Sequence, residues 1–241
     1  MLKILLLGCN GRMGQAVSRV VSERDNVEIT VGFDIKDNLS DFNGEIDVVV
    51  DFSHVDNLPA VLGYCQRHKL PVVLAVTGYD NTALAKITEA AKSIPVFQSS
   101  NMSLGANLLM DLAAKAATVL GEQFDIEIVE RHHGGKLDAP SGTALDIYNR
   151  VAEVLPESPQ LQHDRSKNRK RRNRNEIGLH AVRGGTIVGD HDVIFAGYDE
   201  VLEIRHSAQS RDIFAAGAVS AAEFIANKPS GLYGMRELVN V

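Results

Sequence analysis

Residues 2–14 read LKILLLGCNGRMG, and this stretch decides the fold. Leu2 to Leu7 is a short, continuous apolar run, which is typical of a parallel strand buried on both faces. A glycine-rich turn follows, and a helical pattern begins directly after it. Small residues in such a turn let a pyrophosphate reach the backbone N–H groups at a helix start. The stretch predicts a dinucleotide site, although Asn10 stands where the usual G-x-G-x-x-G pattern has its second glycine.

An acidic residue follows at the spacing that a dinucleotide site requires. Val27 to Phe33 is the expected second strand, and Asp34 ends it twenty residues after Gly14. At that place a carboxylate binds the adenosine ribose hydroxyls. Lys36 is placed to reach the 2′-phosphate of NADPH, so we expect use of both NADH and NADPH without a strong preference for NADPH. The alternative is that Asp34 only ends a strand.

Strands and helices alternate through the rest of the first hundred residues. Strands are expected at 48–50, 71–76 and 94–98, and helices at 55–69 and 81–92; the regular part of the first helix either starts at Pro59 or is kinked there. This rhythm predicts a doubly wound parallel sheet, whose ligands bind at the carboxyl ends of the strands. Those ends lie at Gly8, Asp34, Phe52, Thr77 and Asn101.

The second half of the chain changes character. An apolar helix is expected over 103–120, a strand over 127–131, a helix over 141–155, short strands over 177–182, 186–188, 192–196 and 201–206, and a final helix over 211–226. We therefore expect an α/β protein: a Rossmann-like dinucleotide-binding domain of residues 1–103 and 212–241, and a smaller α+β substrate and oligomerisation domain of residues 104–211 with an open mixed sheet.

Residues 127–144, EIVERHHGGKLDAPSGTA, place two imidazoles, an amine and a carboxylate just before a helix start. His132 is the natural proton donor because an imidazole titrates near neutral pH, and Lys136 would supply a proton or a fixed positive charge. Backbone N–H groups of Ser141, Gly142 and Thr143 at the helix start would hold a substrate carboxylate. The alternative is that neighbouring histidines in a Gly-rich loop are solvated or end a strand.

On these residues the chain resembles the dihydrodipicolinate reductase (4-hydroxy-tetrahydrodipicolinate reductase) family. Its signature, E-x-x-E-x-H-H-x-x-K-x-D-A-P-S-G-T-A, is present at every fixed position. The resemblance implies that His132 and Lys136 are the proton-donating pair, and that His133, Gly142 and Thr143 hold the substrate's carboxylates. It also implies a homotetramer in which a partner subunit closes the open sheet.

The resemblance extends to the cofactor half. It implies that segments 75–77 and 99–102 contact the nicotinamide part, by backbone contacts at Ala75 and Val76, where many members have other residues. The residues predicted to bind NADH or NADPH are Gly8, Cys9, Asn10, Gly11, Arg12, Met13, Gly14, Asp34, Lys36, Phe52, Ala75, Val76, Thr77, Ser99, Ser100, Asn101 and Met102.

Composition narrows the function classes. A net charge of −6 argues against a nucleic-acid-binding protein. Cys9 and Cys65 provide neither a disulfide framework nor metal-ligand spacing, so no metal is expected. We expect no leader peptide and no apolar run of membrane-spanning length, and hence the cytoplasm. The run RSKNRKRRNRN at 165–175 is expected to be a solvated, mobile loop; the alternatives are a nucleic-acid or localisation role, or positive potential near an anionic ligand.

The leading hypothesis is NAD(P)H-dependent reduction of 4-hydroxy-tetrahydrodipicolinate, a small dicarboxylate, to tetrahydrodipicolinate on the route to diaminopimelate and lysine. One alternative is another nicotinamide-dependent dehydrogenase of a dicarboxylate, which should lack the 127–144 string. The other is a non-catalytic, dinucleotide-sensing protein. His180, His191 and His206 fall within strand patterns, so structural roles are expected for them.

Overall fold

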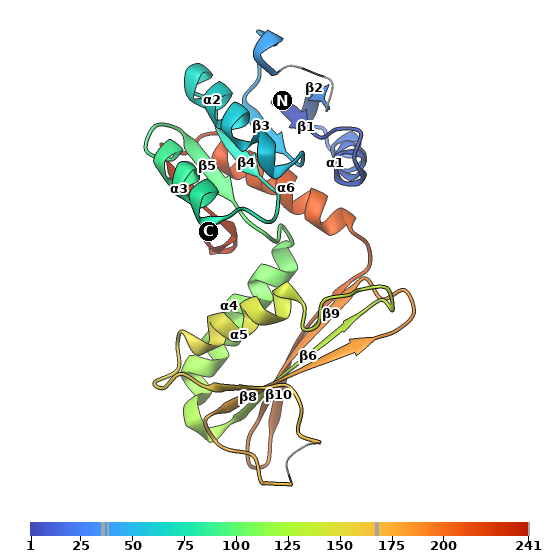
Figure 1. Cartoon of the computed structure of the whole chain (residues 1–241), viewed down its shortest axis with the longest axis vertical. Coiled ribbons are helices and arrows are strands. Elements are labelled where there is room, and N and C mark those ends of the chain that lie inside the picture. Colours follow the sequence, from blue (N-terminus) through green and yellow to red (C-terminus); the bar gives the residue numbers. More distant parts are fainter. Residues whose placement is uncertain (35–36, 38, 167–168, 241) are drawn as a thin grey trace. The chain divides into compact units, whose positions relative to one another are not determined.

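The computed structural model describes residues 1–34, 37, 39–166 and 169–240. The chain divides into two compact units (Figure 1). The first contains Met1–Leu104 and Arg211–Val241, and the second contains Gly105–Ser210. The chain thus leaves the first unit at the start of one helix and returns to it at the start of another.

The first unit is built on a six-stranded sheet in the order β11-β5-β4-β3-β1-β2. All of its strand pairs are parallel, as expected for a doubly wound fold. The strands are β1 (Leu2–Leu7), β2 (Val27–Phe33), β3 (Val48–Asp51), β4 (Val72–Leu74), β5 (Pro95–Gln98) and β11 (Gly231–Tyr233). The short strand β11 was not predicted, because three residues carry no periodic pattern.

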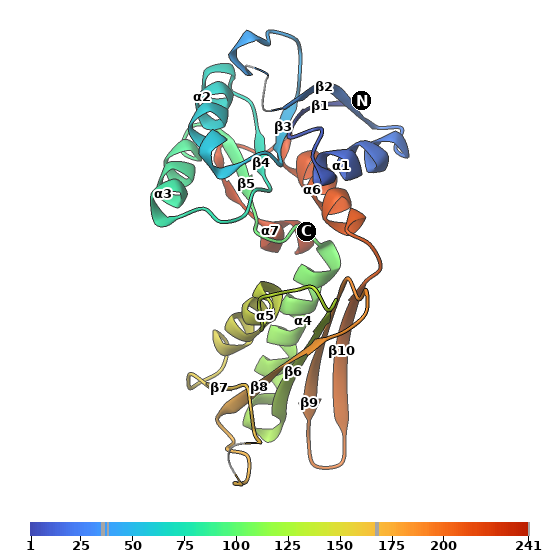
Figure 2. The ribbon, with the colours of Figure 1, turned by 45° about the vertical axis from the view of Figure 1, so that its right-hand side comes forward.

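Helices cover both faces of this sheet. Helices α1 (Arg12–Ser22), α6 (Asp212–Ile225) and the short α7 (Met235–Val239) contribute to one core cluster, and α2 (Leu58–His68) and α3 (Asn81–Ala90) to the other. Figure 2 shows α1 and α6 lying together. Short 3-10 helices lie at Leu39–Asp41 and Val55–Asn57. Pro59 lies in the first turn of α2, where its missing N–H has no intrahelical partner to lose, as predicted.

The second unit contains a mixed five-stranded sheet in the order β10-β9-β6-β8-β7. β8 is parallel to β6 and β7, whereas β9 is antiparallel to β6 and β10. The strands are β6 (Asp125–His132), β7 (Gln160–Gln162), β8 (Glu176–Arg183), β9 (Gly189–Ala196) and β10 (Val201–Ala208). The predicted strand at 186–188 was wrong. Gly185 has a φ of +51°, and the backbone turns there before β9 begins.

Two helices cover one face of this sheet, α4 (Leu104–Leu120), extended by the 3-10 turn Gly121–Gln123, and α5 (Gly142–Ala152). β6 alternates strictly between buried and partly exposed positions. Ile126 and Ile128 therefore belong to the core beneath the helices, and Glu130 and His132 continue the same face toward the end of the strand. Glu127 points to the opposite face.

Helix α4 corrects the expectation that no apolar segment reaches membrane-spanning length. Leu104–Gln123 is long and apolar enough by length and composition alone. A helix packed in a protein core can be equally long and apolar. In this helix Leu109, Met110, Ala113 and Ala117 lie in the core of the second unit. The packing therefore accounts for the apolar residues on that side of the helix.

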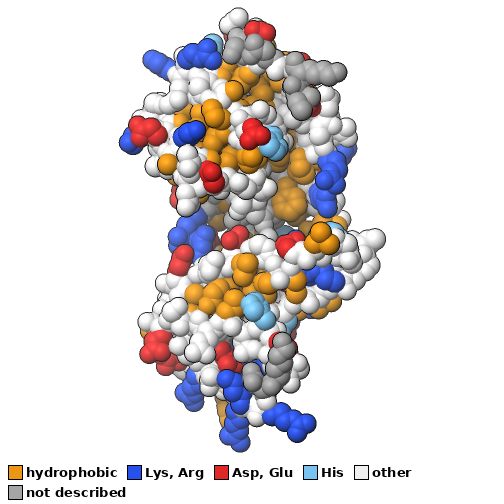
Figure 3. All heavy atoms as spheres, in the orientation of Figure 1, with side chains coloured by type: hydrophobic (Ala, Val, Ile, Leu, Met, Phe, Trp, Pro, Cys, Tyr) orange, Lys and Arg blue, Asp and Glu red, His pale blue; other side chains and the backbone are white. Residues whose placement is uncertain are grey.

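The basic run 165–175 also differs from expectation. Arg172 is not a solvated side chain: its guanidinium donates to Glu127 Oε1 at 3.0 Å and Asp125 Oδ1 at 2.7 Å, and to the carbonyl oxygens of Ile126 and Glu176. Arg165 pairs with Glu127 and Glu176. The remaining described cations of this loop are exposed, and Lys and Arg side chains gather at that end of the second unit (Figure 3). Arg172 and Arg165 tie the loop to acidic residues of the sheet.

Candidate active site

The turn after β1 has the close backbone packing that a dinucleotide cradle needs. Gly8 has a φ of +77°, and a Cβ on Gly14 would lie 2.2 Å from the carbonyl oxygen of Gly8. Only glycine fits there, so the start of α1 lies directly against the turn. Gly11 caps α1 without a side-chain hydrogen bond, and the first turn of α1 contains no acidic residue. These features suit a pyrophosphate at the helix N-terminus.

The second-strand carboxylate lies beside this turn. Asp34 Oδ2 accepts a hydrogen bond from the backbone N–H of Asn10 at 2.9 Å. Asp37 Oδ2 in turn accepts from the N–H of Asp34 at 2.7 Å. Asp34 is thus oriented by the glycine-rich turn itself, which is the arrangement that a ribose-binding carboxylate needs. Lys36, the predicted contact of the 2′-phosphate, lies outside the described residues.

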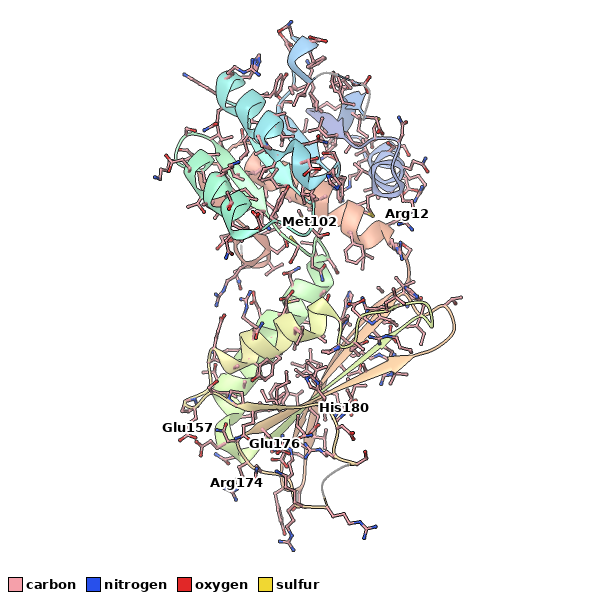
Figure 4. All side chains as sticks on the ribbon, in the orientation of Figure 1. Arg12, Met102, Glu157, Arg174, Glu176 and His180 are labelled. Carbon is pink, nitrogen blue, oxygen red and sulfur yellow. The ribbon has the colours of Figure 1, made fainter. Side chains whose placement is uncertain are left out.

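Two cavities bring most of the predicted cofactor residues together. One, of about 370 Å³, is lined by Gly8, Gly11, Asp34 and Phe52 among others. The second, of about 720 Å³, is lined by Arg12, Met13, Phe52, Ala75, Val76, Thr77, Ser100 and Met102 among others. Arg12 and Met102 are labelled in Figure 4. The first unit could therefore hold a dinucleotide, with the glycine-rich turn at its phosphates and the two cavities at its ends.

Other predicted residues do not line these cavities. They are Cys9, Asn10, Gly14, Ser99 and Asn101. Ser99 and Asn101 hydrogen-bond within their own turn, where Ser99 Oγ donates to the carbonyl oxygen of Asn101 at 2.8 Å. Conversely, His54 lines both cavities and Phe214 the second, and neither was predicted. The only sequence signal for His54 was its place two residues after Phe52.

The predicted proton donor, His132, lies at the end of β6 and is 9% exposed. Its Nδ1 lies 2.7 Å from Oε2 of Glu130. Its Nε2 faces Gly189 at the start of β9, where a Cβ would lie only 3.0 Å away. The strand alternation places the histidine and the carboxylate on one face, and the missing side chain at Gly189 leaves room for the ring.

Glu130 is fully buried but well supplied with donors. Arg183 donates to both of its oxygens at 2.7 Å, and the backbone N–H of Ser141 donates to Oε1 at 3.0 Å. Burial alone would raise the pKa of Glu130, but the hydrogen bonds from Arg183, His132 and Ser141 together lower it. Glu130 is therefore an anion beside His132 at neutral pH.

Lys136 and His133 lie in the loop after β6. Lys136 Nζ forms an ion pair with Asp138 Oδ1 at 2.8 Å, and the amine beside it lowers the pKa of the Asp138 carboxyl. The N–H of Lys136 donates to the carbonyl oxygen of His133, which closes a turn. Arg183 also donates to the carbonyl oxygen of Asp138 at 2.7 Å. The guanidinium that holds Glu130 thus also holds the loop that carries Lys136.

Ser141 differs from its predicted role. It is 2% exposed, its N–H is taken by Glu130, and its Oγ accepts from the N–H of Ala144 at 3.2 Å and lies 3.2 Å from Nε2 of His191. Ser141 therefore caps α5 and braces the site from inside, rather than presenting itself to a substrate. Gly142 and Thr143, in the first turn of α5, and His133 stay as the predicted contacts of the substrate carboxylates.

The chain matches one protein family over nearly its whole length. Residues 2–102 match the family described as dihydrodipicolinate reductase, N-terminus, and residues 105–239 match dihydrodipicolinate reductase, C-terminus. The chain belongs to the dihydrodipicolinate reductase family. It is 47% identical to the 4-hydroxy-tetrahydrodipicolinate reductase of Caldanaerobacter subterraneus subsp. tengcongensis, over 99% of this chain and 98% of the relative. It is 44% identical to that of Clostridium tetani, over 100% and 98%.

A solved member of the dihydrodipicolinate reductase family has the same fold. It is the dipicolinate-bound dihydrodipicolinate reductase from Paenisporosarcina sp. TG-14, with a TM-score of 0.81 and 26% identity, covering 98% of this chain and 99% of that one. The match confirms the family and the α/β fold that the sequence predicted.

Proposed function

We infer that this protein reduces 4-hydroxy-tetrahydrodipicolinate to tetrahydrodipicolinate with NADH or NADPH, a step in diaminopimelate and lysine biosynthesis. The observation that carries this inference is identity of up to 47% with curated reductases of this name over essentially the full length of both chains. The two-cavity dinucleotide site of the first unit and the intact signature at 127–144 support it. A reductase needs both.

When bound, the nicotinamide would supply a hydride for the carbon conjugated with the ring imine, once the substrate has lost water. The protein's residues supply the proton and hold the substrate. We propose that His132 protonates the neighbouring carbon and that Lys136 adds positive charge or a proton there. His133, Gly142 and Thr143 bind the carboxylates, because backbone N–H groups in the first turn of α5 favour anions.

The same proposal assigns the dinucleotide to the first unit. The turn from Gly8 to Gly14 would hold the pyrophosphate, Asp34 would bind the adenosine ribose, and segments 75–77 and 99–102 would contact the nicotinamide half. Asp37 lies against Asp34, which adds a second carboxylate near the ribose. We still expect both NADH and NADPH to serve, without a strong preference for NADPH.

We also propose a cytoplasmic homotetramer, closed through the second unit. On the face of that sheet that α4 and α5 do not cover, Val182 is 44% and Val201 60% exposed. A partner's sheet would bury these side chains. No nucleic-acid or membrane partner is proposed. Light scattering on a sizing column would give the mass of the assembly, and a monomer at working concentration would contradict the tetramer.

The direct test follows the loss of nicotinamide absorbance with NADH and NADPH separately. The substrate is made freshly from pyruvate and aspartate semialdehyde by the preceding synthase. Wild type should oxidise both cofactors, whereas His132→Ala should be slower by roughly 10²–10⁴, the usual reach of general acid catalysis. His163→Ala is the matched control, since His163 lies in the same unit and its Nδ1 lies 3.4 Å from the carbonyl oxygen of Leu179.

Two other functions make different predictions. Another dicarboxylate dehydrogenase would oxidise cofactor with a different substrate and not with this one. A dinucleotide-sensing protein would bind cofactor without oxidising it under any dicarboxylate. If His132→Ala kept near-full turnover, the assigned reaction would still hold, but His132 would not be its proton donor.

A further inference from the structure

The carboxylate of Glu130 receives four contacts inside the second unit. Oε2 faces His132 Nδ1 and Arg183, and Oε1 faces Arg183 and the N–H of Ser141, all at 2.7–3.0 Å. Two of the four come from one guanidinium, which binds the carboxylate as a fork. Every protein group around Glu130 other than the imidazole is an obligatory donor. The carboxylate is therefore an acceptor at both oxygens.

This arrangement assigns the proton on His132. An ionised carboxylate can only accept a hydrogen bond, so Nδ1 of His132 must carry a hydrogen to lie 2.7 Å from it. The remaining ring nitrogen, Nε2, is then the one that can give up a proton. With Nδ1–H held on Glu130, the imidazole ring has one orientation at the end of β6.

Arg183 connects this pair to the neighbouring loop. Besides its fork on Glu130, it donates to the carbonyl oxygen of Asp138, and Asp138 pairs with Lys136. Arg183 lies on β8, which is hydrogen-bonded in parallel to β6, so His132 and Arg183 are direct partners in the register. Arg183 thus contacts the partners of both proposed proton donors: Glu130, which faces His132, and Asp138, which pairs with Lys136.

We propose that Glu130 is the positioning residue of His132, and that Arg183 keeps Glu130 in place. The catalytic part of this proposal rests on the proposed function. In the step itself the Nε2–H bond breaks and a C–H bond forms beside the carbon that received the hydride. The ring is left neutral, with Nδ1–H still on Glu130, which neither gains nor loses a proton.

The same strand provides a matched comparison on its other face. Glu127 Oε2 lies 2.8 Å from Nε2 of His180, and its Oε1 pairs with Arg172 and Arg165. This is also a Glu, His and Arg cluster, three residues away from Glu130 but on the side away from His132. Glu127→Gln therefore removes the same kind of charge without touching His132.

The first test needs no substrate. Nitrogen-15 spectra of the full-length protein with labelled histidine, at neutral pH, show which ring nitrogen of His132 carries hydrogen. We expect hydrogen on Nδ1 in wild type and in Glu127→Gln, and loss of that preference in Glu130→Gln. A neutral His132 in wild type with its hydrogen on Nε2 alone would overturn the proposal. Because this readout is independent of turnover, it also decides the case if wild type proves inactive and the proposed function fails.

The second test is kinetic. Glu130→Gln should lower kcat by roughly 10²-fold, while the KM for substrate and the Kd for NADH stay within about threefold, because a misplaced proton donor affects the chemical step. Arg183→Lys, which keeps a charge, should lose less than Arg183→Met. Glu127→Gln should leave kcat unchanged. Equal kcat in Glu130→Gln and wild type would overturn the proposal. If Glu130→Gln does not fold, the Arg183 variants decide: a kcat equal to that of wild type in both Arg183→Lys and Arg183→Met would overturn the proposal.

Discussion

Gly14 approaches the glycine-rich turn so closely that a Cβ on it would lie 2.2 Å from the carbonyl oxygen of Gly8. The contact is with backbone, which has no flexible end to move aside. The start of α1 and the end of β1 are therefore locked together by the absence of a side chain at Gly14.

Gly14→Ala should weaken cofactor binding by at least roughly tenfold, because the helix start must move away from the pyrophosphate position. Titration of NADH fluorescence measures the Kd. Gly63→Ala in α2 is the control, since a Cβ there meets nothing within 4 Å. It should raise the free energy of unfolding by about 0.5–1 kcal/mol and leave the Kd unchanged. A normal Kd in Gly14→Ala would show that this turn does not hold the phosphates.

Gly189→Ala should slow turnover by roughly tenfold or more with little change in cofactor binding. The new Cβ would lie 3.0 Å from Nε2 of His132, so the ring must shift by a few tenths of an ångström from its working position. Gly184→Ala is the control, because its Cβ meets nothing within 4 Å. Steady-state kinetics of both variants would reveal whether the place of the His132 ring matters.

His191 should make the protein lose stability in mild acid. Burial, together with the nearby His132, lowers the pKa of His191 to about 4 from its usual value near 6.5. Between these values the unfolded chain binds a proton that the folded protein does not, so the free energy of unfolding falls as pH falls from 6.5 toward 4. The loss from this residue approaches about 3 kcal/mol.

Urea denaturation of wild type and His191→Gln at a series of pH values would isolate this contribution. The wild-type free energy of unfolding should fall more steeply than that of the variant between pH 6.5 and 4, and the two slopes should agree above pH 7. Parallel curves across the acid range would contradict a neutral, buried His191.

Arg172→Ala should lower the free energy of unfolding by about 1–3 kcal/mol, because Glu127 and two backbone carbonyl groups lose a charged donor. Arg174→Ala should change it by no more than about 0.5 kcal/mol, since Arg174 is exposed in the same loop. Figure 4 labels Arg174 at that end of the second unit. Equal effects of the two substitutions, measured by urea denaturation, would restore the view of this loop as uniformly solvated.

Much of the first unit could be predicted because its signals are local. The apolar run of β1, the glycine turn and the position of Pro59 each specify their own backbone. The shortest strands were harder: β7 of the mixed sheet and β11 of the parallel sheet are three residues long and owe their pairing to strands elsewhere in the chain. The segment 186–188 has strand-forming residues, but the turn at Gly185 decides its conformation.

The candidate active site was likewise predictable only in part. The signature identified His132 and Lys136, but no pattern in the sequence says that the N–H of Ser141 is taken by Glu130, eleven residues earlier. Similarly, a run of cations does not reveal that Arg172, in the loop before β8, donates to Glu127 on β6. Such partners arise from tertiary packing, which residue spacing does not encode.

The most direct test of the central claim follows the hydride itself. The protein is incubated with freshly formed 4-hydroxy-tetrahydrodipicolinate and with NADH deuterated at both positions of the reactive nicotinamide carbon. The mass of the product is then measured by mass spectrometry. Tetrahydrodipicolinate carrying a single deuterium is the predicted result. Cofactor that stays reduced, or is oxidised without deuterium entering this product, would contradict the assigned reaction.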